Sequence, residues 1–206
     1  MNRSVKEVTY HGEAKAFEAG TEYGGDYTTA IPPPGGTATR TWSDALGRVV
    51  KIDHFTDAQR TKAVSTTYEY DVRGHRTKVT DDSGVTWTSV YDARGRETST
   101  TDPDRGTSLF TYDNSDRQTS VTDSRGVRLE SEYDELGRKT AEFQVSGVNR
   151  TKRAAWQYDT LALGLLTSST RYEGDAAYTT QVTGYDADYQ PTGRKVIIPA
   201  AAGALQ

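Results

Sequence analysis

Tyr91-Asp92-Ala93-Arg94-Gly95-Arg96 and Tyr133-Asp134-Glu135-Leu136-Gly137-Arg138 are two copies of one hexapeptide pattern, and this pattern decides the fold. A degenerate copy has Ser43 in the tyrosine position, followed by Asp44-Ala45-Leu46-Gly47-Arg48. Self-similarity at a fixed period is the mark of a repeat protein. Tyr-Asp pairs begin at six positions, the first four of them 21 residues apart: Tyr70, Tyr91, Tyr112, Tyr133, Tyr158 and Tyr185.

The aspartate and the glycine of each copy carry the chemistry of a tight turn. An aspartate at the first turn position accepts hydrogen bonds from backbone N–H groups further along the chain. A glycine at the fourth position supplies a positive φ and closes a hairpin with a bulge. A second Asp-x-x-Gly signal follows roughly ten residues later, as in Asp81–Gly84 and Asp123–Gly126. Each unit therefore predicts two turns and two strands of about six residues, a normal strand length.

The residues between the turns alternate with the period of a β-strand. Val127, Leu129 and Ser131 share a face with Tyr133, and the three charged residues between them face the other way. Such alternation indicates half-buried strands. The repeated tyrosine is predicted to close each strand, with its ring stacked on those of neighbouring units and its hydroxyl bonded to polar atoms. The fold class is therefore all-β, an antiparallel meander of hairpins.

The copies differ in how closely they follow the pattern. Asp116 replaces the turn glycine of the Tyr112 copy, Asp159–Gly164 is a longer turn, and Asp186–Tyr189 has no glycine. Hairpins are expected there too, because aspartate adopts left-handed geometry at modest cost. The residues assigned to the structural motif are Tyr70, Asp71, Gly74, Tyr91, Asp92, Gly95, Arg96, Tyr112, Asp113, Tyr133, Asp134, Gly137, Arg138, Tyr158, Asp159, Tyr185 and Asp186.

The composition supports a sheet-rich fold with a thin core. Hydrophobic residues make up 33% of the 206, and the formal net charge is −4. The mean hydropathy is −0.77. Disordered chains are also poor in apolar residues, but they lack aromatics, whereas this chain has 13 Tyr. The absence of cysteine excludes disulfides, thiolate metal sites and cysteine nucleophiles.

Two further classes of segment are not expected. The longest apolar stretch, Leu161–Leu166, is too short to cross a bilayer. Residues 1–12 lack the apolar run of a signal peptide.

The ends of the chain are predicted to differ from its middle. Residues 1–40 read as an N-terminal connector of irregular structure, because the prolines of Ile31–Gly36 exclude a central strand. Residues 12–19 are compatible with a helical turn that Gly20 stops. The repeat region is assigned to residues 41–195. Residues 196–206 read as a connector into a further module, since Ile198–Gly203 resembles the earlier proline segment.

The sequence contains no motif that is typical of a catalytic site. There is no Gly-x-Ser-x-Gly elbow and no glycine-rich phosphate loop, and the three histidines lack metal spacing. Paired carboxylates such as Asp102 and Asp104 recur at turns, where aspartate has a structural role. Calcium binding is a stronger alternative than catalysis for these aspartates, because turns rich in aspartate offer oxygen ligands. However, the sequence has neither an EF-hand loop nor a calcium-binding nonapeptide. The chain is therefore predicted to be no enzyme and to need no cofactor.

The sequence offers candidate residues for nucleic-acid binding and for carbohydrate binding, and in both cases a structural role is the alternative. The densest basic patch, Arg150, Lys152 and Arg153, reads as a solvated strand face rather than a nucleic-acid site. Tryptophans on a strand face can stack on sugars, so Trp42, Trp87 and Trp156 are candidates for carbohydrate binding. Core packing is favoured for them, because Trp87 and Trp156 fall on the face of the repeat tyrosines.

Tyr-Asp-x-x-Gly-Arg followed by Thr-Asp-x-x-Gly at this spacing closely resembles the YD-repeat or Rhs-repeat family, over roughly residues 40 to 195. The resemblance implies a segment of a long β-sheet that spirals into a hollow shell. In that family the shell encloses a C-terminal toxin domain, as in bacterial contact-dependent weapons and insecticidal toxin complexes, and related repeats serve adhesion in animal teneurins.

The resemblance also sets the expected partners and location. The partners would be flanking Rhs repeats and an enclosed C-terminal toxin. The residues themselves add cell-surface glycans as an alternative partner, through the strand-face aromatics, and predict no nucleic-acid partner and no membrane span. The location would be secreted or cell-surface, as part of a larger bacterial protein. The family's autoproteolytic Asp-Pro-x-Gly signature has no counterpart, because the single Asp-Pro pair, Asp102-Pro103, lies in a repeat turn.

Overall fold

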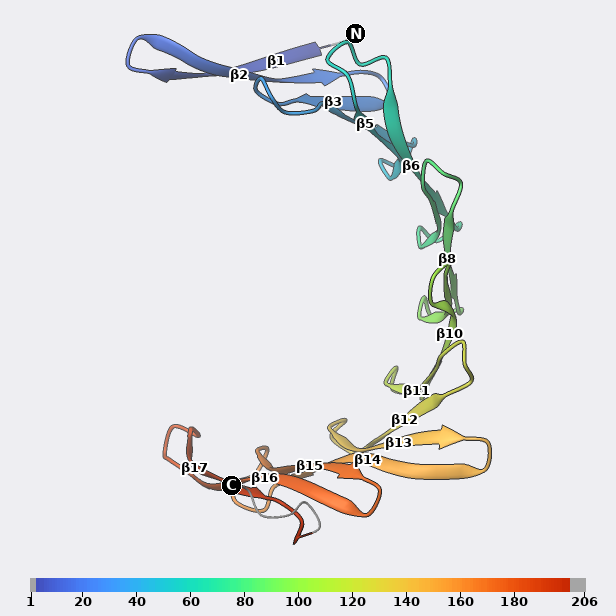
Figure 1. Cartoon of the computed structure of the whole chain (residues 1–206), viewed down its shortest axis with the longest axis vertical. Helices are drawn as coiled ribbons and strands as arrows, with labels where there is room; N and C mark the ends of the chain where they lie inside the picture. Colours follow the sequence, from blue (N-terminus) through green and yellow to red (C-terminus); the bar gives the residue numbers. More distant parts are fainter. Residues whose placement is uncertain (1–2, 201–206) are drawn as a thin grey trace. The chain divides into compact units, whose positions relative to one another are not determined.

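The computed structural model describes residues 3–200 and consists of β-strands joined by turns (Figure 1). These residues form 17 strands and no α-helix. The chain divides into two compact units, of which the first ends at Arg105 and the second begins at Gly106. The all-β fold predicted from the sequence is confirmed.

The first unit is an antiparallel meander of nine strands, in which each strand pairs with the next along the chain. Its strands are β1 (Arg3–His11), β2 (Ala14–Tyr23), β3 (Tyr27–Ile31), β4 (Thr39–Ser43), β5 (Val49–Phe55), β6 (Ala63–Tyr70), β7 (Arg76–Thr80), β8 (Thr86–Tyr91) and β9 (Glu97–Asp102).

The second unit repeats this plan with eight strands, again paired antiparallel in chain order. Its strands are β10 (Gly106–Tyr112), β11 (Gln118–Thr122), β12 (Arg128–Tyr133), β13 (Lys139–Ser146), β14 (Asn149–Tyr158), β15 (Leu166–Glu173), β16 (Ala176–Tyr185) and β17 (Pro191–Ile197).

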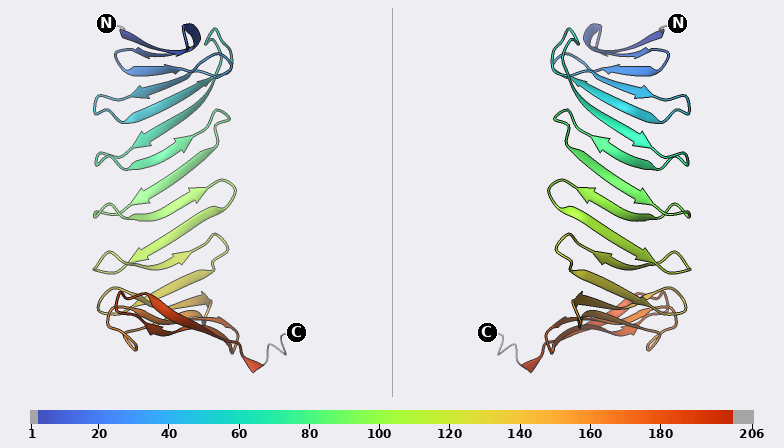
Figure 2. Two further views of the ribbon diagram at one scale, coloured as in Figure 1. Left: turned by 90° about the vertical axis from the view of Figure 1, so that its left-hand side faces the viewer. Right: turned by 90° about the vertical axis from the view of Figure 1, so that its right-hand side faces the viewer.

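Every Tyr-Asp pair ends one strand and begins a turn. The pairing register shifts by one residue at this point, for example between Glu69 and Tyr70 and between Glu132 and Tyr133. The glycine that follows has a positive φ, +90° at Gly74 and +82° at Gly137. The predicted hairpin with a bulge is thereby confirmed. Within each unit these turns follow one edge of the ribbon and the remaining turns follow the other (Figure 2).

The three irregular copies also form hairpins. Asp116 takes the glycine position with a φ of +63°, and Tyr189 does so with +61°. The longer turn keeps a glycine, Gly164, at +83°. The expectation of hairpins at all three positions is therefore confirmed.

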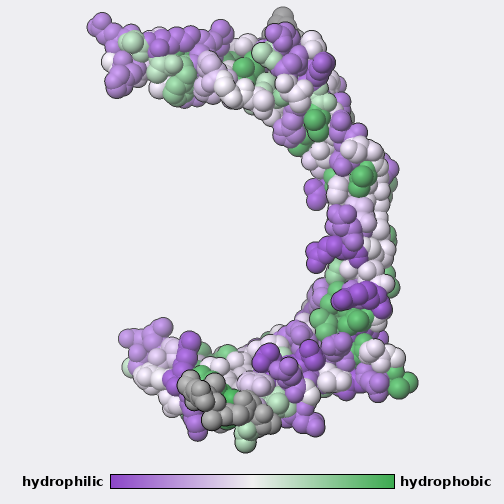
Figure 3. All heavy atoms as spheres, in the orientation of Figure 1, coloured by the Kyte–Doolittle hydropathy of each residue, from purple (hydrophilic) through white to green (hydrophobic). Residues whose placement is uncertain are grey.

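The sheet is a single layer, so few side chains are buried from both sides. Among the described residues the buried apolar side chains are Phe55, Ala141 and Val182. Thr29, Asp53, Ser120 and Thr167 are buried as well, although they are polar. The space-filling view shows hydrophobic atoms only in small patches among hydrophilic ones (Figure 3). The low hydrophobic content agrees with this, because nothing within residues 3–200 forms a second layer over the sheet.

The expectation of irregular structure over residues 1–40 is wrong. Strands β1, β2 and β3 occupy most of residues 3–31, and residues 14–19 belong to β2 instead of a helical turn. These strands lack the Tyr-Asp signal, and their regularity comes from pairing with each other. The proline segment does leave the sheet after Ile31, as predicted, and turns back through a Gly36 N–H to Pro33 C=O hydrogen bond of 3.1 Å.

The C-terminal connector is also partly a strand, since β17 extends to Ile197. The rest of the predicted connector, from residue 201 onward, lies outside the described residues.

Candidate functional site

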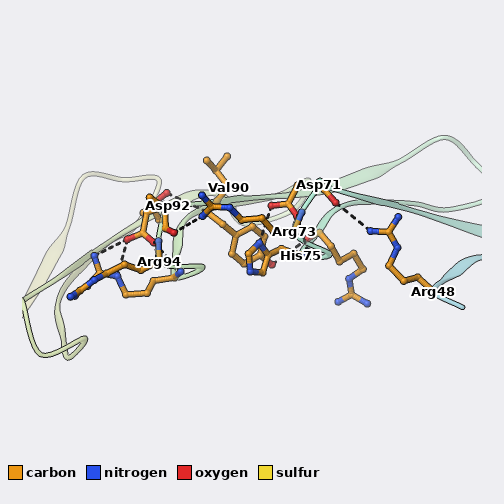
Figure 4. A network of polar contacts seen from close by, with 12 residues as sticks. Arg48, Asp71, Arg73, His75, Val90, Asp92 and Arg94 are labelled. Carbon is orange, nitrogen blue, oxygen red and sulfur yellow. Dashed lines mark hydrogen bonds and ion pairs between the residues drawn. The ribbon is translucent and has the colours of Figure 1, made fainter. Parts of the chain in front are cut away.

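The strongest concentration of polar contacts lies at the Tyr-Asp corners, each defined here as the segment from the repeat tyrosine (or Ser43) to the residue that follows the turn glycine. At the corner of Asp71, one carboxylate oxygen accepts the N–H groups of Arg73 and His75, both at 2.9 Å. The other oxygen lies 2.9 Å from Nδ1 of His75. Figure 4 shows this network from close by. One aspartate thus holds both the backbone of the turn and the side chain that follows it.

The same arrangement recurs with arginine at four other corners, whereas Leu165 and Gln190 follow the turns of Asp159 and Asp186. The guanidinium Nε donates to the corner aspartate at 2.7 Å in the pair Arg48–Asp44, 2.8 Å in Arg96–Asp92, 2.6 Å in Arg117–Asp113 and 2.7 Å in Arg138–Asp134. Planar guanidinium groups suit such charge-assisted contacts. The sixth position of each copy is therefore a structural position, occupied by histidine only at residue 75.

Such contacts lower the pKa of the carboxylates of Asp44, Asp71, Asp92, Asp113, Asp134 and Asp159. The contact with the His75 imidazole, followed by the backbone N–H bonds, holds the pKa of Asp71 below its ordinary value. At Asp92 the Arg96 side chain is the main cause of the same shift. Asp159 is the extreme case, because hydrogen bonds from Arg138 and then from the Gly164 N–H lower its pKa to about 2. These six aspartates are thus held as anions, the form that accepts hydrogen bonds.

The basic residue of one corner reaches the tyrosine of the next. The guanidinium carbon lies 4.8 Å from the ring centre of Tyr70 for Arg48, 5.0 Å from Tyr133 for Arg117 and 4.4 Å from Tyr158 for Arg138. His75 replaces this contact with a ring stacked on Tyr91, with centroids 4.8 Å apart. Cation–π contacts of this kind stabilise by about 0.5–1 kcal/mol at exposed sites.

Further bonds tie each corner to its successor. Arg117 Nη1 donates to the Asp134 carbonyl at 2.9 Å, and Arg138 binds both carboxylate oxygens of Asp159 at 2.8 and 2.5 Å. Arg73 donates in the same way to the Ala93 carbonyl. The corners are therefore joined in series within each unit, one to the next.

The tyrosine hydroxyl makes the return contact. It donates to the carbonyl of the residue directly after the preceding corner: Tyr70 to Val49 (2.7 Å), Tyr91 to Arg76 (3.2 Å), Tyr133 to Gln118 (2.8 Å), Tyr158 to Lys139 (3.0 Å) and Tyr185 to Leu166 (2.7 Å). Tyr112 ends β10 beside its corner aspartate, Asp113. The predicted role of the hydroxyl is therefore seen at five of the six repeat tyrosines by these bonds.

The predicted stacking of tyrosine rings on one another is replaced by these arginine and histidine contacts. Successive corners are two strands apart, which separates equivalent rings by about 9.5 Å. Aromatic pairs need centroids about 4.5–7 Å apart. The basic side chain of the earlier corner fills this gap. Arg48, His75 and Arg117 were not assigned to the motif from the sequence, although they occupy the same sixth position as Arg96 and Arg138.

The three tryptophans are half-buried and do not lie together. Trp42 donates from Nε1 to Asp53 at 2.7 Å and lies 4.9 Å from the ring of Tyr27. The indole of Trp87 contributes, after the backbone N–H groups of Arg105 and Asp104, to lowering the pKa of Asp102. Trp156 has the Lys139 ammonium 5.3 Å from its ring centre. Trp42 is thus engaged in packing, and the other two each line a groove.

Two residues of the basic patch contact neighbouring side chains. Arg150 pairs with Glu130 at 2.8 Å and with Glu132 at 2.6 Å, and its guanidinium lies 3.4 Å from the ring centre of Phe143. Lys152 lies over the same ring at 5.5 Å.

No catalytic or metal-binding arrangement is evident at the corners. Within residues 3–200, no three His, Cys, Asp or Glu side chains come together in a way that would hold a metal ion. In the same part of the chain, no helix has the length and apolarity to cross a membrane.

Comparison with known proteins agrees with the repeat geometry. The family model for the RHS Repeat matches residues 44–86 and 91–128. No curated protein matches the chain by sequence.

Solved structures share the fold. A Photorhabdus luminescens Tc holotoxin pore with a TccC3 variant has a TM-score of 0.73 at 15% identity, covering 88% of this chain and 10% of that one. The TcdB2-TccC3 crystal structure has a TM-score of 0.63 at 15% identity, covering 93% and 13%. The same complex without its hypervariable C-terminal region has a TM-score of 0.62 at 14% identity, covering 94% and 14%. The chain thus spans only 10–14% of these larger chains.

Proposed function

From the premise that this chain carries RHS repeats, we propose that it is a non-catalytic structural segment of a larger RHS-repeat protein. In that protein it forms part of a β-shell that encloses or presents a C-terminal toxin. The likeness to Tc holotoxin structures supports the fold of such a segment. We assign the repeat region to residues 41–195, and the turn hydrogen bonds that the Asp44 and Asp186 corners share support this assignment.

The observation that carries this proposal is the serial linkage of the corners. At the regular corners the aspartate, the basic residue and the next tyrosine together join one hairpin to the next, as in Arg117 between Asp113 and Tyr133. A repeat protein is stabilised in this way by interactions between nearest neighbours. The polar residues that might have served catalysis are thereby committed to holding the sheet. Flanking repeats of the same kind are the natural partners of its two end strands.

The enclosure of a toxin is tested on the longer protein that contains this chain. A specific protease site is inserted directly after the repeats, ahead of the downstream domain. We expect this site to stay uncut in the intact protein and to be cut when Arg117→Ala and Tyr133→Ala together break a corner link. Val148→Ala, at an exposed hairpin tip, is the matched control and should leave the site uncut. Immediate cutting in the unaltered protein would show that the repeats do not enclose the downstream domain.

Carbohydrate binding at a cell surface is the second candidate, and two grooves favour it. One has a volume of ≈ 400 Å³ and is lined by Trp156, Tyr178 and the hydroxyls of Ser169 and Thr180. The other has ≈ 350 Å³ and is lined by Trp87, Ser89 and Thr100. Aromatic rings beside hydroxyl groups offer a sugar both a stacking surface and hydrogen bonds.

A glycan array followed by thermal unfolding tests this second candidate. A bound glycan should raise the melting temperature, and the rise should disappear in Trp156→Leu or Trp87→Leu. Trp42→Leu is the control, because Trp42 lines neither groove. If no glycan on the array binds, carbohydrate binding is rejected and the shell role is the one that remains. Both roles place the protein outside the producing cell or on its surface.

A further inference from the structure

The strand β2 is paired on both sides for only part of its length. It pairs with β1 from Ala14 to Tyr23, whereas β3 pairs only with Gly20 to Tyr23. Within the first unit, no other strand pairs with Ala14–Ala19 on the β3 side. Figure 1 shows the β1–β2 hairpin extending past β3. An unpaired strand edge presents the N–H and C=O groups of every second residue, which are available to a further strand.

A second overhang in the chain shows how such an edge can be protected. In the second unit, β14 pairs with β15 only from Ala154 onward, which leaves Asn149–Arg153 open on that side. This stretch carries Arg150, Lys152 and Arg153, and charged residues are the usual defence of an edge against pairing. Ala14–Ala19 instead reads Ala-Lys-Ala-Phe-Glu-Ala, with two charged residues of opposite sign among six, whereas three of the five residues in Asn149–Arg153 are basic. The β2 edge is therefore the less protected of the two.

The open edge continues into a groove of the first unit. This groove has a volume of ≈ 790 Å³, and Glu18, Ala19 and Gly20 of β2 line it. The loop between β3 and β4 and the loop after β5 form its walls. The apolar part of the lining includes Ala19, Ile31, Ala38, Ala58 and the three prolines Pro32, Pro33 and Pro34. A volume of this size is within the range of pockets that hold ligands.

The charged side chains of the groove already have partners, including Asp57, whose carboxylate accepts the backbone N–H groups of Thr61 and Lys62 at 2.9 Å. Lys6 pairs with Glu18 at 2.7 Å, and Arg60 pairs with Glu22 at 2.7 Å. A charged ligand would have to break one of these pairs, whereas an uncharged one would leave both intact. The groove therefore favours an uncharged occupant with small apolar groups.

We propose that the Ala14–Ala19 edge of β2 and the adjoining groove bind an extended, uncharged peptide segment by strand addition. A polypeptide in the extended form supplies backbone donors and acceptors at the spacing that a strand edge requires. Six residues of strand span about 20 Å. Every second side chain of the added segment faces the apolar lining of the groove. This binding goes beyond the scaffold role, since it needs a partner that the repeats themselves do not supply.

The test uses the full chain and a defined probe. The probe is an acetylated, amidated and fluorescently labelled hexapeptide, Thr-Val-Thr-Val-Thr-Val, titrated by anisotropy. The matched control peptide carries N-methyl groups on its three valines, which remove the donors along one edge. Hydrogen exchange of the protein is measured with and without each peptide. We expect saturable binding of the probe, slower exchange within Ala14–Ala19, and no change within Asn149–Arg153.

One variant separates groove binding from effects on folding. A Cβ at Gly20 would meet Val5 O and the Ile31 side chain only at 3.7–3.8 Å, which is ordinary contact. Gly20→Leu should therefore fold with an unchanged or higher melting temperature, because glycine weakens a strand. Its larger side chain occupies the groove beside Ile31, and we expect at least tenfold weaker binding of the probe.

Three outcomes would overturn the proposal. The first is no saturable binding of the probe, and the second is equal binding of the N-methylated peptide. The third is protection of Ala14–Ala19 by self-association without any peptide, which would assign the edge to a second copy of the chain. None of these results tests the serial linkage of the corners. The peptide-binding proposal can therefore fail without affecting the proposed scaffold role.

Discussion

At the residue scale, each corner depends on a glycine that has no side chain to strain. Gly74 has a φ of +90°, and a Cβ added to it would meet no heavy atom within 4 Å, whereas a Cβ at Gly95 would lie 2.7 Å from Nε2 of His75. The two glycines share a backbone requirement but differ in their surroundings. Substituting each glycine therefore distinguishes the free-energy cost of backbone strain from that of a steric clash.

Gly74→Ala and Gly95→Ala are expected to destabilise the protein unequally. Left-handed geometry costs a non-glycine residue about 1–2 kcal/mol, and both variants bear this cost. Gly95→Ala must also displace the His75 ring from its stack on Tyr91, so its melting temperature should be the lower of the two. Thermal unfolding followed by circular dichroism measures both. Equal melting temperatures would mean that the His75 stack contributes nothing.

A second residue-scale prediction concerns the tyrosine hydroxyl. Tyr133→Phe keeps the ring beside Arg117 but removes the 2.8 Å bond to the Gln118 carbonyl. A net loss of about 0.5–1.5 kcal/mol is expected, the usual contribution of one hydrogen bond. Denaturant unfolding measures the loss, and Tyr10→Phe, an exposed ring of β1, is the control. If both substitutions have the same effect, the hydroxyl is not part of the link between corners.

At the element scale, the hairpins differ in how well their turn residues fit. The β16–β17 hairpin has Tyr189 in the glycine position, with a φ of +61° and a side chain that is 65% exposed. The backbone of Tyr189 is therefore strained, and its exposed ring gains no burial that would offset the cost of this strain. The hairpin forms nevertheless, because its strands pair from Thr179 to Tyr185.

Replacing this residue should stabilise the hairpin. Tyr189→Gly relieves the left-handed strain, and we expect a gain of about 1 kcal/mol. The gain is measured as slower hydrogen exchange in β16 and β17. Gly137→Ala, at the same position of a regular corner, is the inverse control and should speed exchange in β12 and β13. A faster exchange in Tyr189→Gly would show that the tyrosine ring supports the turn.

The link between neighbouring hairpins should be sensitive to acid. The pKa of Asp159 is about 2, below its ordinary value, because Arg138 donates to it. A lowered pKa contributes stability that is present above the unfolded value of about 4 and is lost as the pH falls through 2. Asp159→Asn should therefore lower the melting temperature at pH 6, and its difference from the unaltered protein should shrink between pH 4 and pH 2.

A control for this acid effect lies in the next turn. Asp175 is an exposed carboxylate between β15 and β16, and Asp175→Asn should show no comparable loss at pH 6. If the Asp159→Asn difference stays constant from pH 6 to pH 2, the ion pair with Arg138 does not contribute to stability.

At the scale of the whole molecule, stability is a sum over neighbours instead of a property of one core. Among the described residues only three apolar side chains are buried. Each strand contacts chiefly the strands before and after it. Such a protein tolerates the loss of a complete unit far better than the loss of part of one, because a complete unit restores the same neighbours.

Deleting Asp71–Tyr91 tests this additivity. The deletion removes β7 and β8 and joins Tyr70 directly to Asp92, which recreates a Tyr-Asp corner. We expect a folded sheet with a modestly lower melting temperature. Deleting Asp71–Thr80 removes β7 alone, so the following strand would run in the wrong direction and the sheet should not form. Circular dichroism distinguishes the two, and loss of the fold in both would argue against independent units.

The sequence by itself determined the corners and the strands between them. Asp71, Gly74 and their equivalents specify a turn through local hydrogen bonds and a positive φ, so a short repeated signal was enough to predict the hairpins and the alternation of faces. The family resemblance was also readable at this level, since it depends on the same spacing.

Only the tertiary structure decided what each repeat tyrosine touches and where the sheet is left open. Arg48 reaches Tyr70 across an intervening strand, and no local pattern reports a contact between residues that are two strands apart. The strands over residues 3–31 likewise lack the turn signal and are defined by their partners. The open edge at Ala14–Ala19 arises from the unequal lengths of β2 and β3, a difference that appears only when the strands are paired.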